Sequence, residues 1–386
     1  MYMLLSLAII LIGAKIGGLA AKKLGQPSVV GEIIIGIVLG PYVLSVLQPT
    51  DFIRGLGEIG IVLLMFLIGL HTDIERFEKL FTEGFAIALL GVVTPLILGS
   101  CAGMLLGWDL AGSVFLGGIL MATSVSITSR ALSELGKLKS RAGTAILDAA
   151  VADDIIGVIA FIFLLALLGG RGFDPFHFLL TISGIGLFFF VVLKLSKRIL
   201  IPFLKFGEHL NFRVKEGLFS LILALILFFA FVSKSVGLSA ILGSFLLGLV
   251  IPHREVKRVQ HEIYAISYGF AIPIFFTYVG VLLNPVMVAF SIVPVSIILF
   301  VAVISKITGC SLVSFPLGFN KAETLLIGFG MVPRMEVAIV MAELGRNAGL
   351  IPSSNFSMII SALVLTILIT PVFLKMIVSR YGKMLK

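Results

Sequence analysis

The sequence predicts an all-α membrane protein that crosses the bilayer many times. Of its 386 residues, 59% are hydrophobic and only 13% are charged, and the mean hydropathy is +1.19. Soluble domains carry charge on about a quarter of their residues. Apolar stretches long enough for a helix to cross a hydrocarbon core of about 30 Å recur along the whole chain. Within that core the backbone must satisfy its own hydrogen bonds, which favours helices.

Other classes of protein fit this composition poorly. A transmembrane β-barrel would show short segments of alternating polarity, and these are absent. The formal net charge is +9, but the basic residues lie in loops between apolar segments and form no aromatic-interleaved, nucleic-acid-binding domain. We therefore expect a lipid-embedded chain with no nucleic-acid partner, no cofactor and no enzymatic activity.

Thirteen membrane-spanning helices are expected. Proline-containing turns such as Gln26-Pro27 and Asn284-Pro285 separate neighbouring apolar segments. The expected spans are approximately residues 3–22, 28–47, 57–72, 83–107, 110–135, 142–168, 176–202, 213–233, 237–252, 264–283, 287–314, 320–346 and 355–380.

The basic residues support this number and give an orientation. Of 29 Lys and Arg residues, 21 lie at the loops that follow odd-numbered spans and four at the loops that follow even-numbered ones. Cytoplasmic loops are enriched in Lys and Arg. We expect an external N-terminus and a cytoplasmic C-terminus.

An odd number of spans suggests an internal symmetry. Spans 1–6 and 8–13 would form two six-helix halves of opposite orientation, joined by span 7. Inverted repeats of this kind build many secondary transporters, whose sites lie near the midplane at broken helices. The fifth span of each half is a poor continuous helix: residues 122–129 are rich in hydroxyl groups, and Gly328, Gly330 and Pro333 interrupt span 12.

Four ionisable residues stand out deep within the expected spans. Asp153 and Asp154 are near the middle of span 6, Lys306 is in span 11, and Glu336 is in span 12, two residues after Arg334. A charge near mid-bilayer costs about 2.5 kcal/mol or more, so a functional role is its default explanation.

The paired aspartates suit cation/proton exchange. Adjacent carboxylates in a low dielectric cannot both ionise cheaply, and they titrate as a pair. A small cation or protons can neutralise them, and competition between the two would couple their fluxes. Lys306 can pair with an aspartate when no cation is bound.

Span 5 offers further oxygen ligands for a hard cation such as Na⁺, with Thr123, Ser124, Ser126 and Thr128 as candidates. Structural roles are the alternatives. The aspartates could instead bond to serines of a neighbouring helix and Lys306 could serve only to stabilise the fold, and support of a helix break is the preferred interpretation for Arg334 and Glu336. For Ser126 and Thr128, packing between helices is the preferred interpretation.

Several motifs in this order and spacing are similar to those of one family. They are Gly31-Glu32 and residues 36–41, residues 64–70, Ala122-Thr123-Ser124-Val125, Asp153-Asp154, residues 273–276 with Val279-Gly280, Lys306, and residues 330–334 with Glu336. The chain resembles, nearly end to end, the monovalent cation:proton antiporter-2 family, in particular its NapA-type sodium/proton antiporters.

The resemblance implies a fold, a site and a motion. The fold is the sodium/proton antiporter fold, with spans 5 and 12 broken and crossing at the ion site. Asp154 would be the main ion- and proton-binding carboxylate, with Asp153 sharing the work and Lys306 as its salt-bridge partner. Thr123, Ser124 and Glu336 would line the site, and Pro333 and Arg334 would support the break.

The same resemblance implies a homodimer with an elevator motion. Residues 1–82 and 203–285 would form a dimerisation scaffold, residues 83–168 and 286–386 a mobile core, and residues 169–202 a linker helix. We expect an electrogenic antiporter in the inner membrane of a prokaryote, exchanging Na⁺, or Li⁺, for H⁺ in pH and salt homeostasis. The alternatives are a K⁺/H⁺ antiporter and, less favoured, a cation channel. An intramembrane aspartyl protease is disfavoured because its two aspartates lie on different helices.

Overall fold

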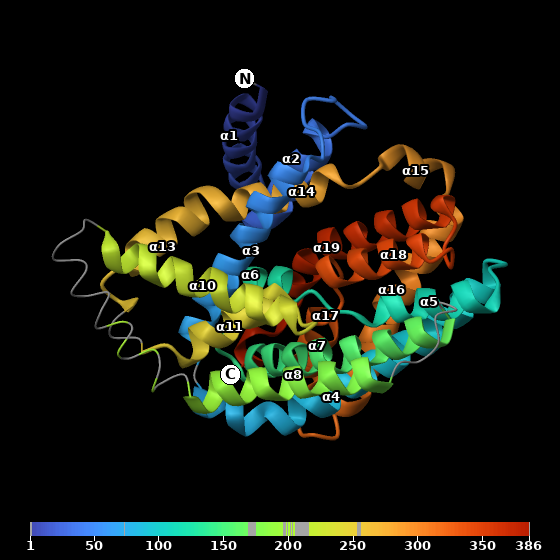
Figure 1. Ribbon diagram of the computed structural model, residues 1–386. Coiled ribbons are helices and arrows are strands. Elements are labelled where there is room, and N and C mark those ends of the chain that lie inside the picture. Colours follow the sequence, from blue (N-terminus) through green and yellow to red (C-terminus); the bar gives the residue numbers. More distant parts are fainter. Residues whose placement is uncertain are drawn as a thin grey trace. The chain divides into compact units, whose positions relative to one another are not determined.

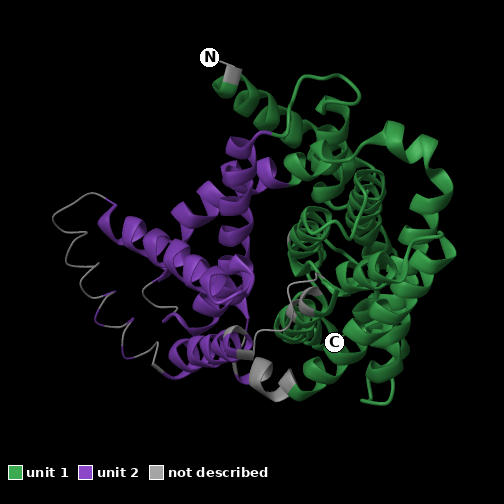
Figure 2. Ribbon diagram, turned by 45° about the vertical axis from the view of Figure 1, so that its right-hand side comes forward, with its two compact units in different colours: residues 1–49, 76–174, 276–386 green, residues 50–75, 175–275 purple. Residues whose placement is uncertain are grey.

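Figure 1 shows the computed structural model of the chain, whose regular secondary structure is helical throughout the described residues. The structure describes residues 2–72, 74–168, 175–195, 198, 200, 202, 204, 216–252 and 256–385. The chain folds into two compact units (Figure 2): residues 1–49, 76–174 and 276–386 form unit 1, and residues 50–75 and 175–275 form unit 2.

Unit 1 contains the termini and most of the helices. Its elements are α1 (Tyr2–Lys23), α2 (Ser28–Leu39), most of α4 (Ile74–Leu105), α5 (Leu110–Met121), α6 (Val125–Glu134), α7 (Arg141–Leu168), most of α14 (Ile272–Val281), α15 (Pro285–Phe290), α16 (Ile292–Ser314), α17 (Lys321–Gly330), α18 (Glu336–Asn347), α19 (Ser353–Tyr381) and the 3₁₀ turn η3 (Gly382–Met384).

Unit 2 is a smaller helical bundle. Its elements are α3 (Asp51–His71), α8 (Pro175–Phe190), the π-helical turn η1 (Val191–Leu195), α10 (Gly217–Ser235), α11 (Ala240–Val250), α13 (Gln260–Ile266) and the π-helical turn η2 (Ser267–Ala271). Helix α11 packs against both α3 and α10. Gly69 and Gly248 allow this approach, because a Cβ on either residue would overlap the backbone of the facing helix.

Helix is present in each of the thirteen expected ranges, with some different boundaries. In the described chain, eight helical segments are long and apolar enough to cross a membrane, and shorter apolar helices lie at Ser28–Leu39, Phe178–Lys194 and Ala240–Val250. Helix α2 ends at Leu39 and not near residue 47, because Pro41 disfavours helical backbone at the residue before it. The end of the expected seventh span falls mostly outside the described residues. Thirteen crossings and inverted repeats stay predictions.

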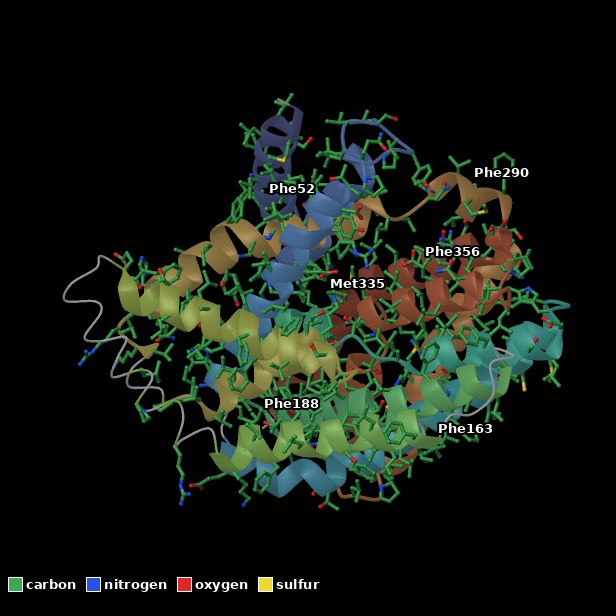
Figure 3. The ribbon with its side chains drawn as sticks, viewed as in Figure 1. Phe52, Phe163, Phe188, Phe290, Met335 and Phe356 are labelled. Carbon is green, nitrogen blue, oxygen red and sulfur yellow. The ribbon has the colours of Figure 1, made fainter. Side chains whose placement is uncertain are left out.

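Large apolar side chains cover much of the outer surface of these helices. Phe290 stands away from α15 in Figure 3 and is 86% exposed. Exposed Leu, Ile, Phe and Met side chains also line α1, α4 and α8. Extended apolar surface of this kind is costly in water and fits a lipid environment.

The two expected helix breaks are present. Between α5 and α6 the backbone is extended at Ala122 and Ser124. Between α17 and α18 the helix is interrupted over residues 331–335. Pro333 lies in this second gap, where it contributes no backbone N–H to a helix.

Two apolar clusters in unit 1 lie on either side of these breaks. The first cluster takes buried side chains from residues 115–122, 161–164, 295–302, 338–342 and 359–363. The second takes them from residues 131–132, 142–149, 310, 319–331 and 374–377. On α7, α16, α19 and the two broken pairs, the segment between the clusters carries polar groups. The buried ones are Thr123, Ser124, Asp153, Lys306, Arg334, Thr366 and Thr370. The fold thus encloses a polar layer between two apolar ones.

Glycines bring α1, α2 and α14 into backbone contact. A Cβ on Gly31 would overlap the Gly17 carbonyl of α1, and a Cβ on Gly36 would overlap the Thr277 carbonyl of α14. A Cβ on Gly280 would likewise overlap the Ile33 carbonyl of α2. Small residues permit this close packing between membrane helices. These three helices are therefore held together backbone to backbone.

Gly36→Ala should destabilise the protein, because its methyl group has no space between α2 and α14. We expect a loss of about 1–3 kcal/mol, as for other overpacked sites, measured by thermal unfolding in detergent micelles. Gly55→Ala is the control, since a Cβ at this exposed position of α3 meets no atom within 4 Å. Equal melting temperatures for the two variants would contradict the packing argument.

Candidate functional site

The centre of the polar layer is a buried ion pair between Asp153 and Lys306. Asp153 lies on α7 and is 1% exposed, and Lys306 lies on α16 and is 0% exposed. Lys306 Nζ is 2.8 Å from Asp153 Oδ1. The backbone N–H of Thr123 donates to Asp153 Oδ2 over 3.0 Å. Both carboxylate oxygens therefore have a donor, which a buried carboxylate requires.

A glycine on α4 leaves room for the lysine ammonium group. A Cβ on Gly91 would lie 3.6 Å from Lys306 Nζ and 3.1 Å from Cys310 Sγ. Cys310 is one helical turn beyond Lys306 and is fully buried. The ammonium group is thus surrounded by α4, α7 and its own helix.

The break after α5 supplies the donor for Asp153 and a further oxygen atom. Because α6 begins at Val125, the N–H of Thr123 is not used within a helix and points to the carboxylate. Thr123 Oγ1 is buried and has no hydrogen-bond partner among the described residues. Thr123 thus brings to the neighbourhood of Asp153 a hydroxyl oxygen that is unbonded within the described part of the chain.

Hydrogen bonds join the two breaks to each other. The backbone N–H of Ser124 donates to the Pro333 carbonyl over 2.7 Å. Thr128 Oγ1 donates to the Gly330 carbonyl at the end of α17. The expected meeting of the two broken helices is therefore present. The Ser124 and Ser126 hydroxyls also bond each other, at 2.9 Å.

Arg334 satisfies carbonyl groups that the breaks leave open. Its side chain is 0% exposed, with Nε 2.6 Å from the Leu120 carbonyl and Nη1 2.6 Å from the Val332 carbonyl. These carbonyls lie at the C-terminal ends of α5 and α17, where the helix dipole favours a positive charge. Arg334 thus links the end of α5 to the gap that follows α17.

Two of the expected site residues are described less fully. Asp154 follows Asp153 on α7 and is half-buried. Glu336 is the first residue of α18, and its side chain lies outside the described residues. Pro333 is buried in the gap before it.

The structure also buries charged residues that sequence reasoning placed at span ends or left undecided. Asp148 is 0% exposed, packs against Gly84 of α4, and has no hydrogen-bond partner for either carboxylate oxygen among the described residues. Glu32 and Arg130 are also buried. The position of these three residues along their spans does not predict that they are buried, because burial depends on which helix packs against each side chain.

Within the described part of the chain, no three His, Cys, Asp or Glu side chains gather as they would for a tightly held metal ion. Around the junction lie instead two neighbouring aspartates of α7, of which Asp153 is held by an ammonium group, and the Thr123 hydroxyl, which has no hydrogen-bond partner among the described residues.

Comparison with known proteins decides the family. A family model described as "Sodium/hydrogen exchanger, transmembrane" matches residues 7–380. The chain belongs to the sodium/hydrogen exchanger family. It is a multi-pass membrane protein, in keeping with its apolar helices.

Relatives in this exchanger family match over nearly their whole length. The chain is 36% identical over 370 residues to the probable Na(+)/H(+) antiporter GerT of Bacillus cereus, covering 96% of this chain and 97% of GerT. It is 33% identical to the Na(+)/H(+)-K(+) antiporter GerN of the same organism, covering 98% and 97%. It is 31% identical to the Na(+)/H(+) antiporter of Enterococcus hirae, covering 96% of each chain.

Solved structures give the same fold for the exchanger. The sodium proton antiporter MjNhaP1 from Methanocaldococcus jannaschii superposes with a TM-score of 0.72 at 17% identity, covering 98% of this chain and 95% of that one. Its structure at pH 8 gives a TM-score of 0.67 at 18% identity.

Lys306→Gln should destabilise the exchanger, because it leaves Asp153 as a buried charge without its cation. Breaking one side of a buried pair costs about 3–5 kcal/mol. Asp153→Asn should act similarly, and the double variant should lose less than the sum of the two. Thermal unfolding in detergent measures all three, with the exposed Lys321→Gln as control. Strictly additive losses would contradict a direct interaction.

Proposed function

We propose that the chain exchanges Na⁺ for H⁺ across the membrane, with Asp154 and Asp153 as the shared binding site for both ions. The observation that supports this most is the buried Asp153–Lys306 ion pair at the junction of two broken helices. Family membership and the names of the relatives point the same way.

Competition for one site would couple the two fluxes. When Na⁺ is bound, the metal ion offsets part of the negative charge of the two carboxylates, and protons at the same oxygen atoms would be repelled. When Na⁺ leaves, protons can replace it. A neutral or cation-loaded site can cross the low-dielectric interior, whereas an unneutralised pair of carboxylates cannot do so cheaply. Only the protonated site and the Na⁺-bound site would therefore cross the membrane.

Lys306 would make the exchange electrogenic. A cation bound by Asp153 takes the place of the ammonium group, and a buried ammonium group without its partner favours loss of its proton. One proton from Lys306 and one from Asp154 would then leave for each Na⁺ bound. The implied ratio of two protons per Na⁺ moves one net charge in each cycle.

The movement we propose is an elevator motion in a homodimer. Residues 83–168 and 286–386 would form the moving core, residues 1–82 and 203–285 the fixed scaffold, and residues 169–202 the linker helix. In support, Asp153, Lys306, Thr123 and Arg334 all lie in the proposed core. Helices α1, α2 and α14 of the proposed scaffold have backbone contacts that favour a fixed unit.

We place the protein in the inner membrane of a prokaryote, with its N-terminus outside and its C-terminus in the cytoplasm. The distribution of Lys and Arg supports this orientation. A role in pH and salt homeostasis follows from the exchange itself.

Potassium is the alternative cation. The relative GerN is named for K⁺ as well as Na⁺. Exchange in proteoliposomes with Na⁺, Li⁺ or K⁺, followed with a pH-sensitive dye, separates the two possibilities. We expect Na⁺ to drive proton movement. Activity with K⁺ and none with Na⁺ would reverse the choice of ion, and cation flux without any pH change would indicate a channel.

Asp154→Asn should reduce Na⁺/H⁺ exchange to background while the protein still folds, because asparagine keeps the shape and loses the titratable charge. The dye assay in proteoliposomes measures exchange, and thermal unfolding in detergent measures folding. Asp51→Asn, at an exposed position at the start of α3, is the matched control and should transport normally. Normal exchange by the Asp154 variant would remove this carboxylate from the mechanism.

A further inference from the structure

A second group of charges, in which Glu32 and Arg130 are buried, joins α2 to α6. Arg130 Nε is 2.7 Å from Glu134 Oε1, and Arg130 Nη2 lies 3.2 Å from Ser28 Oγ and 3.8 Å from Glu32 Oε1. Ser28 donates to Glu134 twice, through its backbone N–H at 2.8 Å and through its hydroxyl. The group therefore bridges the first turns of α2 and the last turns of α6.

This group is enclosed but only partly satisfied. Glu32 is 3% exposed and Arg130 is 6% exposed. Glu32 Oε2 has no hydrogen-bond partner among the described residues. Two carboxylates share one guanidinium group, with Lys15 and Lys22 of α1 near enough to act on Glu32 electrostatically. A partly satisfied polar network holds its helices less firmly than a fully satisfied one.

The contact between α2 and α6 differs in kind from the contacts of α2 with α1 and α14. Its contacts with α1 and α14 are made by glycines, backbone against backbone, at Gly17, Gly31, Gly36 and Gly280. Separating such helices opens a void in the packing. Its contact with α6 is instead made by long polar side chains, which can exchange each other for water. Helix α2 can therefore part from α6 more readily than from α1 or α14.

Helix α6 connects this group to the ion site. Its ten residues, about 15 Å of helix, run from the break that supplies the Thr123 N–H to Asp153 as far as Glu134. Thr128, between the two ends, is bonded to the end of α17. A displacement of α6 at Glu134 would therefore also displace its other end, beside Thr123 and Asp153.

We infer that Ser28, Glu32, Arg130 and Glu134 form a latch, which holds the core against the scaffold in the conformation of this structure and opens once in every transport cycle. This inference rests on the elevator motion proposed above. Helix α2 belongs to the proposed scaffold and α6 to the proposed core, so their polar contact is one that the motion must break.

Covalent closure of the latch tests the inference. Ser28→Cys with Glu134→Cys is prepared in a Cys101→Ala background, because Cys101 is exposed, whereas Cys310 is buried. A short bifunctional thiol reagent with a cleavable disulfide links the pair in proteoliposomes. We expect Na⁺/H⁺ exchange to fall at least tenfold on cross-linking and to return after reduction. Unchanged exchange by fully cross-linked protein would overturn the latch.

Gly18→Cys with Ser28→Cys is the matched control. A Cβ on Gly18 would be 3.4 Å from Ser28 Cβ, close to the spacing of a disulfide, and both residues lie within the proposed scaffold. This pair also removes the Ser28 hydroxyl but leaves α6 free to move. Its exchange rate should be the same before and after cross-linking. Arrest of the control together with the latch pair would contradict a specific role for the α2–α6 contact.

Spin labels give a readout that does not depend on transport. Lys23→Cys on α1 and Ser133→Cys on α6 are exposed and lie outside the latch residues. Pulsed electron resonance should find two label separations whose populations change when Na⁺ is added. If only one distance between the two labels is found at every Na⁺ concentration and pH, the latch inference is wrong. This conclusion holds even for protein that shows no Na⁺/H⁺ exchange. Absence of exchange in the parent would instead count against the proposed function.

Discussion

An ammonium group and a carboxylate 2.8 Å apart, shut off from solvent, impose the main constraint on unit 1. Removing each of these charges from water costs several kcal/mol, and only close pairing with further hydrogen bonds offsets that cost. Asp153 therefore needs a second donor, and a continuous helix has no free backbone N–H to offer in its interior. The interruption before α6 provides one at Thr123. The buried Asp153–Lys306 ion pair therefore depends on the helix break before α6, because the break frees the second donor that the carboxylate needs.

A broken helix creates its own requirements, and the polar layer meets them within a few residues. Arg334 binds carbonyls at the ends of α5 and α17. Ser124 and Thr128 bond the second break. Apolar clusters on both sides keep this layer away from water. The result is a junction of buried charged and polar groups between two apolar clusters, which we propose as the place where the cation binds.

The sequence was sufficient for the helical class and the two breaks. It also singled out buried charges, because charge within an apolar segment is rare and costly, but the roles of these residues in transport stay predictions. Asp153, Lys306 and Arg334 stand out for this reason, and all three lie in the polar layer. Asp148, Glu32 and Arg130 did not stand out, because distance from a span end does not say which helix will cover a side chain. The early end of α2 follows from Pro41, a local signal in the sequence. The position of Gly91 beside Lys306 and Cys310 depends instead on packing between helices, which no local pattern records.

The central claim is that a cation takes the place of the ammonium group at Asp153. Counting the protons released when Na⁺ binds to purified protein tests it most directly, by titration calorimetry in buffers of different ionisation enthalpy. We predict about two protons released for each Na⁺ bound, and about one for Lys306→Gln. Binding of Na⁺ with no proton release would contradict the claim.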